Sequence, residues 1–147
     1  MKNKKNCKEF IRRTIAVLNA YKENLPDNEQ SYDRSLFMNS CLGLLILPKE
    51  EYYKSIPQKS ADVWGFPVEK ISTCGNTDIQ SVIRHLRNAI AHNRIDFECH
   101  EGPSVPIGDI TFVDMCKDGK ENFRVVISFE TFKNFVLQFA NHIIENE

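Results

Sequence analysis

Apolar and polar side chains alternate with helical periodicity in four segments of the chain. Apolar residues recur at helical spacing over residues 5–24, and residues 31–47 are apolar on almost every side until Pro48 ends the run. Residues 77–92 begin with a capping-box sequence, in which Thr77 is the expected N-cap and Gln80 its partner. A last helix is expected after Ser128, with one apolar stripe made of Phe132, Phe135, Val136, Phe139 and Ile143.

A strand pattern lies between the last two of these helical segments. Residues 110–115 and 122–128 flank a turn with Gly119 near its centre and predict a β-hairpin. Residues 49–76 contain several helix-breaking residues, so we interpret them as a connector with at most a short helix near residues 50–54. The expected fold is therefore mainly α: a helical bundle with one small β-hairpin before the last helix, in a single domain over residues 1–147.

Composition and charge narrow the possible functions. The chain has 147 residues and a formal net charge of -1, so it lacks the overall positive field of a general nucleic-acid coater. Any contact with RNA or DNA is therefore expected to be local. The basic amino terminus is not followed by an apolar segment, and no apolar run is long enough to span a bilayer. These features predict a cytoplasmic protein with no membrane partner.

The cysteine pattern does not predict a metal site. The five cysteines are odd in number and never form a CxxC pair, which is typical of reduced thiols rather than a disulfide framework. Cys99 and His100 are adjacent, but no second ligand pair follows at zinc-site spacing. We therefore expect neither a metal nor another cofactor.

The most unusual local feature is the basic stretch RHLRNAIAHNRI, residues 84–95, which has no acidic side chain. At about 100° per residue, one helix face collects the apolar residues Ile79, Val82, Ile83, Leu86, Ala89 and Ile90. The opposite face collects Arg84, His85, Arg87, Asn88 and His92, with the small Ala91 among them. This second face is cationic and leaves room for a ligand or another chain to approach.

Arg87 and His92 are the main candidates for chemistry on this face. They lie about 140° and about 7.5 Å apart on an ideal helix, a geometry that suits a phosphate held between them or across an interface. The spacing alone is weak evidence, because Arg94 and His100 also match it. Arg94 lies where the helix is expected to end, whereas Arg87 is followed by Asn88 and framed by apolar residues.

The segment LRNAIAH, residues 86–92, resembles the RNxxxH form of the Rx4-6H motif of the HEPN superfamily. This superfamily consists of α-helical domains and includes many metal-independent RNases of toxin, abortive-infection and other defence systems. The rest of the chain is also similar to a plasmid- and chromosome-encoded bacterial branch of that superfamily. The similarity includes a buried helix ending LLILPKE, a connector, the motif helix, a hairpin and a final helix.

The resemblance implies a HEPN-like helical bundle that acts as a metal-independent endoribonuclease. It implies a homodimer in which two motif helices face each other and form one RNA-cleaving site. Matched by position, His92 takes a proton from a ribose 2′-OH, as histidines can near neutral pH. Arg87 binds the phosphate and stabilises the transition state, and Asn88 orients His92 or the RNA backbone.

Other interpretations of these residues remain open. Arg84 and His85 could bind RNA phosphates, although a plain surface position is simpler. Asn39 and Ser40 interrupt the apolar second helix and are expected to be hydrogen-bonded core or dimer residues. The alternative function is a non-catalytic HEPN binding module that pairs with a nucleotidyltransferase or antitoxin partner, as the resemblance implies. A third is a structural helical dimer whose motif face is only a solvated basic surface.

Overall fold

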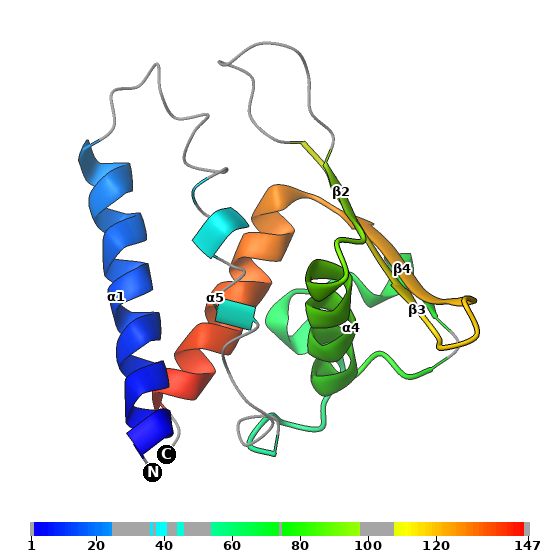
Figure 1. Ribbon diagram of the computed structural model, residues 1–147, viewed down its shortest axis with the longest axis horizontal. Coiled ribbons are helices and arrows are strands. Elements are labelled where there is room, and N and C mark those ends of the chain that lie inside the picture. Colours follow the sequence, from blue (N-terminus) through cyan, green and yellow to red (C-terminus); the bar gives the residue numbers. More distant parts are fainter. Residues whose placement is uncertain are drawn as a thin grey trace.

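The computed structural model describes residues 2–24, 36, 38–40, 44–45, 54–73, 75–97 and 108–145. Its long helices are α1 (Lys2–Asn24), α4 (Ile79–Ala91) and α5 (Phe129–Glu145). Two short 3-10 helices, η2 (Ala61–Trp64) and η3 (Val68–Lys70), precede α4. Figure 1 shows α1 beside α5, with α4 between α5 and the strands in that view.

Four antiparallel strands in the described residues form one sheet in the order β1-β4-β3-β2. The strands are β1 (Ser72–Thr73), β2 (Ile95–Phe97), β3 (Ile110–Met115) and β4 (Glu121–Ile127). The expectation of a mainly α bundle with one small β-hairpin is therefore wrong, and the fold is mixed α/β. The hairpin of β3 and β4 is present as predicted, but β1 and β2 extend it on both sides.

The two edge strands escaped prediction because they are too short to show an alternating pattern. β1 has two residues and β2 has three, and each is held by pairing with a strand distant in sequence. Ser72 pairs with Arg124, and Ile95 pairs with Phe112. Residues 95–97 lie just after the predicted motif helix, residues 77–92, and form a strand that the sequence pattern did not predict.

One face of the hairpin is buried and the other is open. Ile110, Phe112 and Asp114 of β3 are buried, and so are Phe123, Val125 and Ile127 of β4. Between these positions the side chains of both strands are half-buried or exposed. This alternation is the period-two pattern of a sheet with one face against a core.

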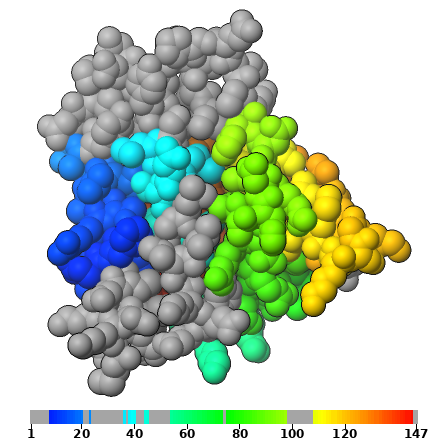
Figure 2. All heavy atoms as spheres, in the orientation of Figure 1, coloured from blue at the N-terminus to red at the C-terminus, as the bar shows by residue number. Residues whose placement is uncertain are grey.

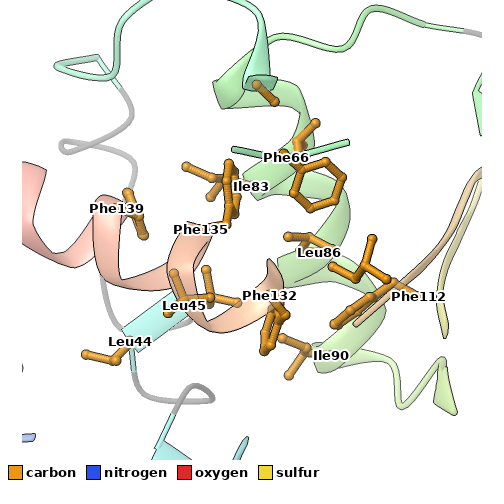
Figure 3. Packing of buried hydrophobic residues seen from close by; sticks show 14 of the residues in the cluster. Leu44, Leu45, Phe66, Ile83, Leu86, Ile90, Phe112, Phe132, Phe135 and Phe139 are labelled. Atoms are coloured by element: carbon orange, nitrogen blue, oxygen red, sulfur yellow. The ribbon is translucent and has the colours of Figure 1, made fainter. Parts of the chain in front are cut away.

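The core forms between the buried sheet face, α4 and α5. Figure 3 shows Ile83 and Leu86 of α4 close to Phe132 and Phe135 of α5, with Phe112 of β3 beside them. The predicted stripe of α5 is buried at every position: Phe132, Phe135, Val136, Phe139 and Ile143. Ser128 caps this helix as predicted, because its hydroxyl accepts a hydrogen bond from the Thr131 N–H at 3.2 Å.

The first helix is also confirmed, whereas most of the second lies outside the described residues. Ile11 and Leu18 of α1 are buried, but Phe10 is 41% exposed. Residues 36, 38–40 and 44–45 are helical. Asn39 is exposed, so the expectation of a core position is wrong for it, whereas the half-buried Ser40 donates its hydroxyl to the Leu36 carbonyl at 2.9 Å. No helix in the described part of the chain has both the length and the apolar character needed to cross a membrane.

The connector carries structure that its composition did not predict. Phe66, just after η2, is buried against the Phe135 ring, with ring centroids 4.9 Å apart. Trp64 lies against the same ring at 5.9 Å and against His142 at 5.6 Å. Residues 50–53, where a short helix was expected, lie outside the described residues. The connector therefore contributes aromatic side chains to the core around α5.

We expect Phe135→Ala to lower the free energy of unfolding by about 3–5 kcal/mol, because it removes a fully buried ring on which two other aromatic rings pack. Urea denaturation followed by circular dichroism measures the change. Phe10→Ala is the matched control and should cost no more than about 1 kcal/mol. Equal losses for the two variants would contradict this core assignment.

Candidate functional site

The motif helix α4 begins one residue later than its sequence suggested. Asp78, not Thr77, is the N-cap, and its side chain accepts a hydrogen bond from the Ser81 N–H at 2.7 Å. Both residues are of types that cap helices well, so the sequence alone did not separate them. All six apolar residues assigned to the core face of this helix are buried, as predicted.

The carboxyl end of α4 turns sharply into β2. His92 is the C-cap, and its backbone N–H donates to the Asn88 carbonyl at 3.0 Å. Asn93 follows in the left-handed conformation with φ of 54°, which asparagine tolerates better than most residues. The Arg94 N–H then donates to the Ala89 carbonyl at 2.7 Å. These bonds fix the direction in which the chain leaves the helix, immediately beside His92.

The predicted site residues lie on a helix face that is only partly covered. His92, Arg84 and Ala91 are exposed, while Arg87 and Asn88 are half-buried. In Figure 2 the green surface that includes α4 is open on the face in view, next to the yellow and orange hairpin. An imidazole, a guanidinium and an amide thus lie within one and a half turns of a single helix, where a phosphate group could approach them.

His85 does not lie on this open face, contrary to the prediction for it. Its side chain is buried, with 8% of the residue exposed, and its ring stacks on Phe123 of β4 at 4.6 Å with an interplanar angle of 11°. Its Nδ1 lies 2.8 Å from Oδ2 of Asp114 and donates to that carboxylate. The prediction failed because a helical projection gives direction but not neighbours, and the sheet covers this side of the helix.

Asp114 of β3 is the central acceptor of a buried hydrogen-bond network. It is 3% exposed, and its Oδ2 also accepts a hydrogen bond from Nδ2 of Asn88 at 3.1 Å. Its Oδ1 accepts from the backbone N–H of Met115 at 2.9 Å and lies 3.9 Å from Nη1 of Arg94. The amide of Asn88 is therefore directed to the sheet, and one carboxylate joins two turns of α4 to the start of β2.

The environment of Asp114 keeps its carboxylate ionised. Burial alone would raise its pKa, but hydrogen bonds from His85, Asn88 and the Met115 N–H, together with the charge interaction with His85, lower the pKa below its ordinary value. The basic motif segment has no acidic residue of its own, so the negative charge beside it is that of Asp114 on β3.

Asp114 was missed in the sequence, although a signal for it was present. In the strand ITFVDM it occupies the same alternating face as Ile110 and Phe112, so a charge was to be expected on the buried side. Arg94, set aside as part of a second Arg and His match, belongs to this network instead. His100, the other half of that match, lies outside the described residues.

No group of three or more His, Cys, Asp or Glu side chains in the described ranges is placed to hold a metal ion. Cys99 and His100, the adjacent pair considered for zinc, both lie outside those ranges. Cys116, in the turn between β3 and β4, is a free and exposed thiol.

Comparison with protein families matches the whole chain, residues 1–147, to the family described as HEPN pEK499 p136. No curated protein matches the chain. No solved structure matches it either.

We expect Asp114→Asn to cost about 2 kcal/mol of unfolding free energy near neutral pH, because one carbonyl oxygen cannot accept all the hydrogen bonds that two carboxylate oxygens accept. The wild-type contribution is complete above the ordinary carboxyl pKa of about 4 and is lost as the pH falls through the lowered pKa of the folded state. The difference between the two proteins should therefore narrow below about pH 4.

Urea denaturation at a series of pH values measures this dependence. Asp62→Asn is the matched control, since Asp62 is exposed on η2, and its profile should stay parallel to that of the wild type. Parallel profiles for Asp114→Asn and the wild type at all pH values would show that the Asp114 carboxylate contributes nothing through its charge.

Proposed function

Because the chain belongs to the HEPN superfamily, in the family described as HEPN pEK499 p136, we propose that it is a metal-independent endoribonuclease with Arg87, Asn88 and His92 at its site. The observation that carries this proposal is the placement of the motif. His92 is exposed at the end of α4, about one and a half turns after Arg87, and Asn88 lies one turn before His92 with its amide hydrogen-bonded to Asp114. A positioned base beside a cation is what phosphodiester cleavage needs.

In the proposed reaction His92 takes the proton of a ribose 2′-OH, and the 2′-oxygen attacks the adjacent phosphorus. The bond between phosphorus and the 5′-oxygen breaks, which leaves a 2′,3′-cyclic phosphate on one product. The leaving 5′-oxygen receives a proton from the protonated His92 of a second copy and becomes a 5′-hydroxyl. Arg87 binds the phosphate oxygens and offsets the negative charge that grows on them in the transition state.

A second copy of the chain is part of this proposal because one face of one helix offers a single imidazole. Ala91 is exposed and lies between the directions of Arg87 and His92 around the helix, and so small a side chain lets another helix approach closely. Two α4 helices packed through this face would bring two copies of Arg87 and His92 to one site. The HEPN membership of the chain supports such a homodimer.

The exposed face of α4 also supports an RNA path that begins near its first turns. Arg84 is exposed one helical turn before Asn88, so we assign it a phosphate contact. His85 contacts Asp114 and Phe123 and has little surface to offer RNA, so of Arg84 and His85 only Arg84 is assigned a phosphate contact. We place the enzyme in the cytoplasm, in a toxin or defence role, with a nucleotidyltransferase or antitoxin as its possible regulator.

The first test is cleavage of RNA by the purified protein in EDTA. We expect His92→Ala to reduce the rate by about 10²–10⁴-fold, since it removes the base. Arg87→Ala should reduce it by about 10²–10³-fold, since it removes a donor to the transition-state charge. Gel analysis of end-labelled RNA at several times gives the rates.

Two control variants show whether a loss of cleavage rate is specific to the motif residues or follows from removing any cation or histidine. Arg12→Ala removes an exposed cation from α1, and His142→Ala removes the histidine of α5, so neither should change the rate per folded molecule. Cleavage that survives in both motif variants would contradict the proposal. A wild-type protein that binds RNA or a partner protein without cutting would instead favour the non-catalytic HEPN module.

The second test addresses the shared site. We expect Ala91→Arg to yield a monomer that does not cleave RNA, because a long side chain at this position blocks the approach of a second α4 while leaving the local positive charge intact. Light scattering gives the number of chains, and Ala16→Arg on the exposed side of α1 is the matched control. A dimeric and active Ala91→Arg protein would place the interface elsewhere.

A further inference from the structure

We propose that Asp114 is a positioning residue for the RNA-cleaving site, which it serves through Asn88 and Arg94 rather than by touching RNA; this inference rests on the proposed function. Asn88 and Arg94 stand on either side of His92 in the sequence, and both contact the same carboxylate. The segment that carries His92 is therefore fastened to the sheet at both of its ends.

Both oxygens of this carboxylate are used. Oδ2 accepts from His85 at 2.8 Å and from Asn88 at 3.1 Å, two residues that are neighbours one turn apart on α4. Oδ1 accepts from the Met115 N–H at 2.9 Å and faces Arg94 at 3.9 Å. Because both carboxylate oxygens have partners, only one orientation of the Asp114 carboxylate makes all these contacts. That orientation determines the direction in which the Asn88 amide points.

Burial makes this arrangement stiff. Asp114 and His85 are 3% and 8% exposed, and a hydrogen bond to an ion is stronger away from water. The His85 ring is stacked on Phe123, so it cannot turn away from the carboxylate without losing that contact. The hydrogen bonds of Asp114 thus hold the polar side of α4, at His85 and Asn88, whereas the apolar core contacts the opposite side of the helix.

The chemical type of the residue supports a role beyond packing. The alternation of β3 places an apolar side chain at the two preceding inward positions, Ile110 and Phe112. An apolar residue in place of Asp114 would continue that surface without the cost of removing a charge from water. A carboxylate, unlike an apolar side chain, orients the groups that donate hydrogen bonds to it, here His85 and Asn88.

The consequence for catalysis is a defined effect on turnover rather than on binding. Loosening Asn88 and Arg94 would let the His92 segment leave its reactive position, and misplacement by about 1 Å can cost about 100-fold in rate. RNA affinity depends mainly on cations that can reach phosphates, such as the exposed Arg84, rather than on the buried Asp114. Removal of the Asp114 carboxylate should therefore lower kcat and leave KM nearly unchanged.

The experiment compares Asp114→Asn with the control Asp62→Asn, which makes the same change in net charge at an exposed position. Both are assayed with RNA in EDTA at a temperature where each is folded. We expect kcat of Asp114→Asn to fall by about 10- to 100-fold with KM within about threefold of the wild-type value. Asp62→Asn should match the wild type in both constants.

A second measurement does not depend on activity. The side-chain amide signals of Asn88 in an NMR spectrum should lie apart from those of the exposed Asn141 in the wild type and move toward them in Asp114→Asn. Unchanged Asn88 signals, an unchanged kcat, or a loss of activity that only follows the unfolded fraction would overturn the inference. If Asp114→Asn does not fold, His85→Phe replaces it, because that variant keeps the ring stack and removes one donor to Oδ2.

His85→Phe should then give a smaller fall in kcat, about 3- to 10-fold, and a shift of the Asn88 signals in the same direction. Wild-type kcat and wild-type Asn88 signals in that variant would also overturn the inference. A wild-type protein that does not cut RNA contradicts the proposed function alone. In that case the Asn88 signals still decide whether Asp114 orients the motif.

Discussion

The hydrogen bonds between the Asp114 carboxylate and α4 are the interaction on which the site depends. The core places α4 against the sheet through its apolar face, but apolar packing is not directional and leaves the polar edge of a helix free to shift. Asp114 supplies the missing direction, because it binds His85 and Asn88 on the helix and lies close to Arg94 beyond it. The motif segment is thereby joined to the hairpin of β3 and β4 through a side-chain carboxylate.

Some residues of the basic segment, residues 84–95, bond to the sheet, and others are exposed at the surface. His85 and Asn88 point toward the sheet and donate hydrogen bonds to a buried carboxylate, while Arg84 and His92 remain at the surface. A cluster that appears uniform in the sequence is therefore partly structural and partly available for a ligand. The sharp turn after His92, with its left-handed Asn93, keeps the imidazole at the surface where the helix ends and the sheet begins.

Sequence periodicity predicted the elements that are long enough to repeat their own pattern. The apolar face of α4, the aromatic stripe of α5 and the alternation of the hairpin were all recognisable. The edge strands were not, since two or three residues show no period and their pairing depends on distant partners. His85 was misplaced for the same reason, because its partner Asp114 is 29 positions away and belongs to the sheet. The roles of Arg87, Asn88 and His92 come from motif and family, and they stay predictions.

We propose that Arg87 and His92 cleave RNA through attack by the ribose 2′-hydroxyl. The most direct measurement is the chemical identity of the product ends when the wild-type protein acts on RNA in EDTA. We expect 2′,3′-cyclic phosphate and 5′-hydroxyl ends, and no cleavage where the attacking nucleotide is replaced by its 2′-deoxy form. Cleavage of the 2′-deoxy substrate, or products that carry 5′-phosphates, would contradict it.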